Sequence, residues 1–195
     1  MQPITMEEVV DIAQYERIRK EFRDKVMAVK DRRRVRVGPA LTFLFENRLT
    51  VLYQVQEMMR AERMVAPEAI RYEVETYNEL LPEPGGLGAS LLIEYPEPEE
   101  RNHRLREMLG LDRHVWLRVG ELPPIRGAFD TRQIGEEKLS SVQYLRFALT
   151  PEHHEVWAAA GDRGKIRIVT DHPAYAHEST LTPAQAQALQ EDFTA

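Results

Sequence analysis

The segments GPALTFLFENR at residues 38–48 and QVQEMMRAER at residues 54–63 decide how this fold is organised. They join an apolar run of strand-forming residues to a stretch crowded with amide and charged side chains. Apolar residues recur at helical spacing over residues 49–64, so the polar groups lie on one helix beside a strand. Such a helix is either a functional surface or an internal brace, and the sequence leaves both interpretations open.

The N-terminal part of the chain is predicted to consist of helices and one β-hairpin. Thr5 and Glu8 have the spacing of a capping box at the start of the first helix. The predicted elements are, in order, an amphipathic helix or two helices in line up to about residue 29, a β-hairpin over 34–46, a helix over 49–64 and a helix with Pro67 in its first turn. The Pro- and Gly-rich segment at 82–88 is the clearest break in the chain.

The C-terminal part alternates between strands and helices. The expected elements are a strand at 89–95, a helix at 97–109 closed by Gly110, strands at 114–119 and 142–149, a short helix that opens at Thr150 and Pro151 and stops at Gly161, and a strand at 165–171. A polar loop over 122–140 separates the two middle strands, and a last helix starts at Thr182 with Gln185 completing a capping box. The order β-α-β-β-α-β is the split arrangement of ferredoxin-like units.

The predicted fold class is therefore α+β, with N-terminal helices and a β-hairpin packed with a β-α-β-β-α-β, ferredoxin-like sheet unit. The break divides the chain into a helical and hairpin part, residues 1–84, and an α+β part, residues 85–195. A chain of 195 residues is of a size that one core can serve, so we expect the two parts to form one compact unit.

Composition restricts the compartment and the partners. The formal net charge of −6 argues against a protein that coats nucleic acid. No apolar run approaches the roughly 20 residues that span a bilayer, and the N-terminus lacks the features of a signal peptide. We therefore expect a cytoplasmic protein with no membrane partner. The chain has no cysteine, so it can form no disulfide and cannot ligate an iron–sulfur cluster through thiolates.

Several short motifs carry a resemblance to a known family. They are Glu46-Asn47-Arg48, Gln54-Val55-Gln56-Glu57-Met58, Tyr77-Asn78 with Leu80-Leu81-Pro82, Val115-Trp116-Leu117-Arg118-Val119-Gly120, Glu137-Lys138-Leu139-Ser140-Ser141-Val142-Gln143 and Asp171-His172-Pro173. From Ile4 to about Phe193 the chain resembles the bacterial domain-of-unknown-function family 3501, which has no assigned activity. Its members are often encoded beside rubrerythrin-like and iron–sulfur oxidoreductase genes. The resemblance thus implies a redox-stress setting in which any cluster belongs to a partner.

A candidate binding surface gathers on the 49–64 helix, the turn that precedes it and the polar loop. On a helical wheel Gln56, Arg60 and Arg63 line one flank, and Glu57 and Arg60 are paired at i, i+3. Long polar loops between strands are often functional, although the charges of this one could equally cover an end of the sheet. The candidate residues are Glu46, Asn47, Arg48, Gln54, Gln56, Glu57, Arg60, Glu62, Arg63, Arg132, Gln133 and Gln143.

Two of these residues also have simpler explanations. Asn47 stands where the N-cap residue of the following helix is expected. Glu62 falls close to the apolar stripe, where partial desolvation would raise its pKa and suit proton transfer or metal binding. Alternatively, Glu62 lies at a fraying helix end and meets Arg63 or Arg32 in a solvated pair.

Residues 30–36 form the basic cluster of the chain, with a net charge of +4. The cluster could dock an acidic partner, a phosphate or RNA. Alternatively, its arginines alternate outward on the hairpin strand and pair with the acidic first helix. The aromatic stacking groups of a single-stranded nucleic-acid site are missing from it.

No metal or cofactor site is predicted. The side chains with suitable donors are Glu57, Glu62, His172 and His177. The two histidines are five residues apart across Pro173, a spacing that fits no standard zinc motif. The glycines at 85–88 follow a helix and precede a strand, the reverse of a phosphate-binding loop. No serine lies in a recognisable nucleophile motif.

Two functions are compatible with these observations. The first is a non-catalytic accessory or binding protein linked to redox-stress systems, whose 54–63 helix and 130–143 loop contact a redox protein or a second copy of the chain, as a homodimer. The alternative is a metal-dependent enzyme or metal-sensing regulator built on Glu46, Glu57 and Glu62 with His172 or His177. Oxygen-rich ligands of that kind would suit iron or manganese. The lack of a recognisable catalytic constellation favours the binding protein over an enzyme.

Overall fold

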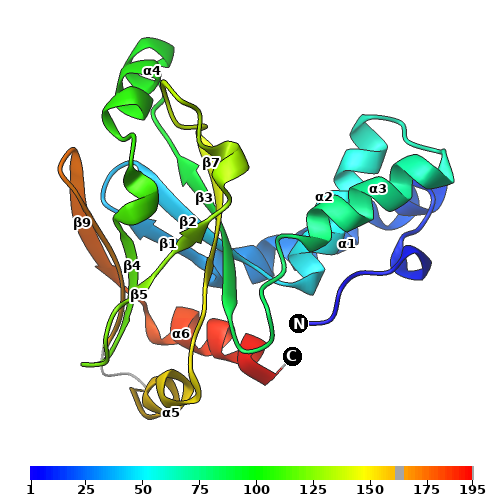
Figure 1. The fold of residues 1–195 in the computed structure, drawn as a ribbon. Coiled ribbons are helices and arrows are strands. Elements are labelled where there is room, and N and C mark those ends of the chain that lie inside the picture. Colours follow the sequence, from blue (N-terminus) through cyan, green and yellow to red (C-terminus); the bar gives the residue numbers. More distant parts are fainter. Residues whose placement is uncertain (161–164, 195) are drawn as a thin grey trace.

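The protein is an α+β structure of two sheets and a helical arm, and the computed structural model describes residues 1–160 and 165–194 (Figure 1). The N-terminal elements are the 3-10 turn η1 (Met6–Glu8), α1 (Ile12–Arg32), β1 (Arg34–Val37), β2 (Leu41–Glu46), α2 (Arg48–Ala61) and α3 (Pro67–Asn78). The remaining elements are β3 (Leu87–Ile93), α4 (Pro98–Glu107), η2 (Leu111–Arg113), β4 (Val115–Val119), β5 (Ile125–Arg126), β6 (Ala128–Phe129), η3 (Thr131–Gln133), β7 (Val142–Phe147), α5 (Pro151–Ala160), β8 (Ile166–His172), β9 (Tyr175–Thr180), α6 (Pro183–Gln190) and η4 (Glu191–Thr194).

The two sheets pack against each other through their apolar faces. The first sheet has the strand order β1-β2-β3-β7-β6 and the second has the order β5-β4-β8-β9. Phe43 and Leu91 of the first sheet share one core with Leu117 and Ile168 of the second, and all four are fully buried. Burial of this apolar surface is the main favourable term in folding. The other face of the first sheet is turned towards the helical arm (Figure 1).

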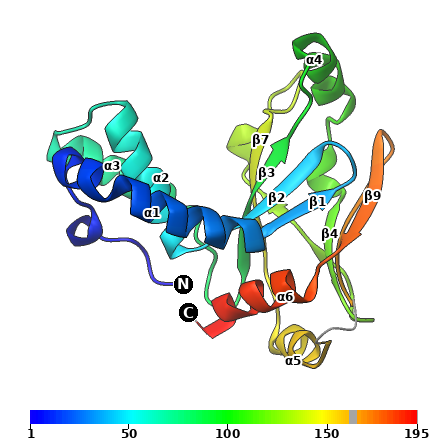
Figure 2. The same ribbon diagram turned by 180° about the vertical axis from the view of Figure 1, so that it is seen from behind.

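The arm consists of α1, α2 and α3, and it encloses a second, smaller core. Val51, Val55 and Val74 are buried there together with Ile4 of the N-terminal segment. Helix α2 contacts both α1 and α3, and Figure 2 shows α1 running along the arm as far as the sheets. Within the described ranges no helix combines the length and the apolarity that crossing a bilayer requires.

Most local predictions for the helices are confirmed. Asn47 caps α2 by accepting the N–H of Thr50, and Pro67 lies in the first turn of α3. Thr182 begins α6 within the expected capping box, and Gly110 follows α4 with a φ of 92°. Short-range patterns alone predict these positions because each cap or turn is made by neighbours in sequence.

The first capping box has a different role from the expected one. Thr5 N–H donates to Glu8 Oε2 over 2.8 Å, but the residues enclose the short 3-10 helix η1 and not the first α-helix. Helix α1 begins later, where Asp11 accepts the N–H of Gln14 over 2.8 Å.

The basic cluster forms part of the hairpin. Strand β1 alternates as the outward interpretation predicts, with Arg34 and Arg36 exposed and the two valines buried. Arg33, which precedes the strand, is instead buried.

The ferredoxin-like arrangement is corrected by the sheet order. Strands β3 and β7 belong to the first sheet and β4 and β8 to the second, so the four strands do not form one sheet. The loop predicted over 122–140 contains β5 and β6, and β9 follows β8 where the sequence pattern predicts no strand. The predicted helix end at Gly161 lies outside the described residues. The sequence predicts in which order most strands follow one another along the chain. It does not predict which strands pair, because pairing depends on residues far apart in sequence.

Candidate functional site

Three polar side chains of α2 that suggest a binding surface, Gln56, Glu57 and Arg60, contact α1 or the segment just before it. The amide of Gln56 is buried and bonds both backbone groups of Val10: the Val10 N–H donates to Oε1 over 2.8 Å, and Nε2 donates to the Val10 carbonyl over 3.1 Å. Arg60 Nε donates to Glu16 Oε1 over 2.6 Å. These contacts tie the N-terminal segment and α1 to α2.

Glu57 accepts three hydrogen bonds from α1. Arg19 donates from Nε and Nη2 to the two oxygens of Glu57, each over 2.8 Å, and Tyr15 donates its hydroxyl over 2.7 Å. The Arg19 hydrogen bonds hold the pKa of Glu57 below its ordinary value. Burial and the bond to Glu57 raise the pKa of Tyr15. Glu57 is therefore a fixed carboxylate, unsuited to releasing or taking up protons near neutral pH.

The two ends of α2 differ in their surroundings. At the N-terminal end Arg48 Nη2 donates to both oxygens of Glu8, over 2.6 and 2.7 Å. At the C-terminal end Glu62 is the cap residue and its side chain is exposed. Arg63, also exposed, has a left-handed φ of 54°. Of the two explanations for Glu62, the solvated helix end agrees with this geometry.

Glu46 lies at the end of β2 with 1% of its surface exposed. Its carboxylate accepts from Thr50 Oγ1 over 2.5 Å, from Ser90 Oγ over 2.7 Å and from Gln54 Nε2 over 3.1 Å. Three neutral donors thus satisfy a buried charge that would otherwise be costly. The charge of Glu46 also acts on Lys30. Burial lowers the pKa of Lys30, and the attraction to Glu46 partly opposes that shift.

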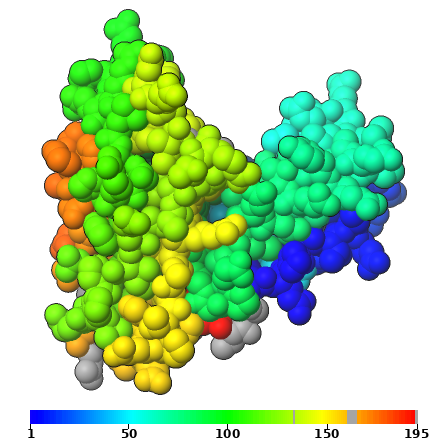
Figure 3. All heavy atoms as spheres, in the orientation of Figure 1, coloured from blue at the N-terminus to red at the C-terminus, as the bar shows by residue number. Residues whose placement is uncertain are grey.

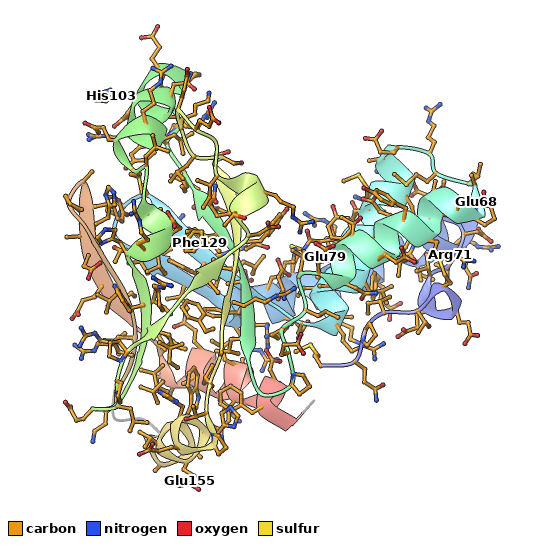
Figure 4. The ribbon with its side chains drawn as sticks, in the orientation of Figure 1. Glu68, Arg71, Glu79, His103, Phe129 and Glu155 are labelled. Atoms are coloured by element: carbon orange, nitrogen blue, oxygen red, sulfur yellow. The ribbon has the colours of Figure 1, made fainter. Side chains whose placement is uncertain are left out.

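A cleft of about 720 Å³ opens between α3 and the first sheet. Figure 3 shows the hollow between the sheets and the arm. Figure 4 labels Glu79 at the end of α3 and Phe129 on the sheet, and both residues line the cleft. The apolar part of the wall comes from Leu80, Ala89, Ala128, Phe129 and Leu145.

Strand register places the polar residues of the wall. Tyr144 of β7 is paired with Ser90 of β3, so the two side chains share the face of the sheet that is turned towards the arm. The next pair on this face is Arg146 and Gly88. A Cβ at Gly88 would lie 2.5 Å from the carbonyl oxygen of Leu80. Glycine therefore lets the segment after α3 lie directly against the sheet, which fixes the end of the helix beside the cleft.

Both guanidinium groups of the cleft are engaged at its rim. Arg132 donates to Asp130 Oδ2 over 2.7 Å and also forms an ion pair with Glu79. Arg146 donates to the backbone carbonyl of Glu79. The bond from Arg132 holds the pKa of Asp130 below its ordinary value. These contacts link η3 and β7 to the last turn of α3 across the rim of the cleft.

Three polar side chains of the wall are not engaged. Among the described residues, the side chains of Glu73, Tyr77 and Tyr144 make no hydrogen bond or ion pair. Burial raises the pKa of Glu73, and the nearby charge of Glu62 adds to the shift. Burial and then the charge of Glu73 raise the pKa of Tyr77 to about 12. Burial raises the pKa of Tyr144, and the charge of Glu46 raises it further. All three groups are available to a ligand.

The polar loop contributes unequally to the cleft. Arg132 lines it. Gln143 is buried and its Nε2 donates to the carbonyl of Ser140 over 2.9 Å. The side chain of Gln133 lies outside the described part of the chain.

The side chains considered as metal ligands are dispersed. Glu57 is held by α1 and Glu62 ends α2, whereas His172 and His177 lie on β8 and β9 of the second sheet. His172 Nε2 is 3.1 Å from the carbonyl oxygen of Leu109. Within the described residues no three or more acidic or histidine side chains are grouped as a metal site.

Sequence reasoning missed Glu73, Tyr77 and Tyr144 as candidate functional residues. The apolar spacing of α3 assigns Tyr77 to its buried stripe, and Tyr144 is one residue of a predicted strand. One signal was present: the apolar residues Leu145 and Phe147 alternate along β7 and are buried, so Tyr144 belongs to the opposite face. The neighbouring residues in the sequence do not indicate that α3 lies opposite this face of β7.

Residues 3–193 match the family described as a protein of unknown function, DUF3501. The match covers nearly the whole chain and confirms the resemblance, so the chain belongs to this family. It is also similar to a crystal structure described as a novel protein of unknown function from Burkholderia pseudomallei K96243. The two share 30% sequence identity with a TM-score of 0.90, over 98% of this chain and 99% of the other. No match is found among curated proteins.

Proposed function

We propose that this protein is a non-catalytic binding protein that holds a small molecule in the cleft between α3 and the first sheet. The observation that carries the proposal is the group of three unengaged polar side chains, Glu73, Tyr77 and Tyr144, on an otherwise partly apolar wall. Small-molecule sites are usually clefts of about 300–1,000 Å³ with apolar walls and a few fixed polar groups. A volume of about 720 Å³ falls in this range.

The cleft supports a binding role better than the polar face of α2 does. Gln56, Glu57 and Arg60 use their hydrogen-bonding groups on α1 and the segment before it, so a partner could bind them only by displacing contacts within the fold. The redox-stress setting rests on the gene neighbours of the family and adds no residue to the site.

The proposal is tested by screening a fragment library against the isotope-labelled full chain and mapping backbone amide NMR shifts. We expect hits that perturb α3 and β7 together. Ala128 is exposed and lines the cleft, so Ala128→Trp should fill the cleft and abolish these shifts. Ala158 is exposed on α5, and Ala158→Trp is the matched control that should leave them unchanged. Hits that survive Ala128→Trp, or a screen without any hit in the cleft, would refute the proposal.

A further inference from the structure

We infer that the cleft takes ligands that carry a cationic group, such as a primary ammonium, with Glu73 as the counter-charge and Tyr77 and Tyr144 around it. This inference rests on the proposed function, because it specifies the ligand class of the same cleft. Its first support is the balance of charge: the described wall carries three carboxylates against two guanidinium groups.

One of the two positive groups of the cleft, Arg132, is already neutralised. Arg132 is paired with Asp130 and Glu79, whereas Arg146 donates to the uncharged Glu79 carbonyl and keeps its positive charge. An anionic ligand at Arg132 would have to displace its two ion pairs and would then face the carboxylates that they release. Since like charges placed together disfavour a complex, the Arg132 side of the cleft disfavours anions.

Glu73 is the negative group without a counter-charge. It is half-buried on α3, and among the described residues no cation approaches it closely enough for an ion pair. Burial and the neighbouring Glu62 disfavour its charged form, which is why its pKa is raised. A bound ammonium group would offset both effects because it supplies the missing opposite charge.

The two tyrosines suit the same ligand. A cation over the face of an aromatic ring is attracted by the ring quadrupole, and each phenol oxygen can accept a hydrogen bond. Behind them lies the buried carboxylate of Glu46, whose charge raises the pKa of both Tyr77 and Tyr144. Glu46 is satisfied by its own donors, so it contributes negative potential without contacting the ligand.

Three probes that share a phenyl ring and differ in charge test this preference. They are benzylamine, which is cationic at neutral pH, benzyl alcohol, which is neutral, and benzoate, which is anionic. Affinities for the full chain are measured by NMR titration. We expect the order benzylamine, then benzyl alcohol, then benzoate. Glu73→Gln should weaken benzylamine by about fivefold and leave benzyl alcohol unchanged. Glu75 is exposed on the same helix outside the cleft wall, so Glu75→Gln is the matched control and should change neither affinity.

The outcomes separate the two proposals. If benzyl alcohol and benzylamine bind equally and both are lost in Ala128→Trp, the binding function holds and the charge preference is refuted. The charge preference is also refuted if benzoate binds best, or if Glu73→Gln and Glu75→Gln behave alike. If no probe binds in a manner sensitive to Ala128→Trp, the binding function itself fails. Benzylamine affinity should also fall on acidification, at a higher pH than an ordinary glutamate would require.

Discussion

Arg33 and Asp192 form an ion pair in the interior, 159 residues apart in sequence, with 2% and 5% of their side chains exposed. The guanidinium also donates to three backbone carbonyls: from Nε to Phe45 over 2.9 Å, from Nη1 to Ala188 over 2.7 Å and from Nη2 to Glu46 over 3.3 Å. The pair therefore connects the end of α1, the end of β2 and the C-terminal helices. Arg33, a residue of the basic cluster, therefore stabilises the fold and is not free to bind an anionic ligand.

Removal of one partner of this pair is expected to be strongly destabilising. Asp192→Asn leaves the guanidinium of Arg33 buried without a counter-charge, and the free energy of unfolding should fall by about 3 kcal/mol. Urea denaturation followed by circular dichroism measures the change. The control is Arg34→Met, because Arg34 is exposed and its ion pair is with the exposed Asp31; its effect should stay within about 1 kcal/mol. An unchanged midpoint in Asp192→Asn would contradict the role given to the pair.

Glu57 should make stability depend on pH. Its pKa is below the ordinary value of 4.5, mainly because of Arg19, so its contribution is complete above that value and is lost as the pH falls through the folded-state pKa. Glu57→Gln should therefore lower the free energy of unfolding at pH 7 by about 1.5 kcal/mol. The difference between variant and parent should shrink as the pH drops below 4.5.

Urea denaturation at a series of pH values tests the Glu57 prediction. Glu21 is exposed on α1, and Glu21→Gln should show no such convergence with the parent protein. A difference for Glu57→Gln that is constant from pH 7 to pH 3 would show that its charge does not stabilise the helix pair.

Gln56 should matter for stability although the helical wheel suggests a surface role for it. Gln56→Ala leaves the N–H and the carbonyl of Val10 without their partners, and we expect a loss of about 2 kcal/mol. Thermal unfolding checks this, with the exposed helical residue Gln187 replaced by alanine as the control. Limited proteolysis should also cut the segment before α1 faster in Gln56→Ala. Equal melting of both variants would be incompatible with a bracing role.

Arg132 is expected to tune the cleft more than the stability of the fold. In Arg132→Ala the pKa of Asp130 should rise towards its ordinary value of 3.8, because the bond that lowers it is gone. Carboxyl carbon NMR titration measures that shift. If the cleft prefers cations, the loss of one positive charge should also strengthen benzylamine by about threefold. Arg126 is exposed on β5, and Arg126→Ala should change neither quantity.

The polar face of α2 shows how far sequence reasoning reached for the site. The wheel places Gln56 and Glu57 off the apolar stripe, and the choice between surface and brace then depends on whether another helix lies beside them. Helix α1 does, with Arg19 and Tyr15 at the right positions. The partner positions are 38 to 42 residues away for Glu57, a separation over which periodicity carries no information.

The cleft was beyond prediction for the same reason. Tyr77 and Tyr144 come together because β3 and β7 pair in the first sheet while α3 ends beside them. The order of elements was compatible with one ferredoxin-like sheet, and only the observed pairing excludes it. Strand β9 was missed because most of its residues are polar and exposed, so its pattern lacks the apolar alternation that marks a half-buried strand.

The sequence by itself determined the helices, the hairpin, their caps and the α+β class, because hydrogen bonds and apolar periodicity between near neighbours set these features. Only the tertiary structure decided which strands share a sheet, that Arg33 and Glu57 turn to partners inside the fold, and that Glu73, Tyr77 and Tyr144 face a common cleft. Those outcomes depend on contacts between distant segments, whose formation follows from packing of the whole chain and not from any local pattern.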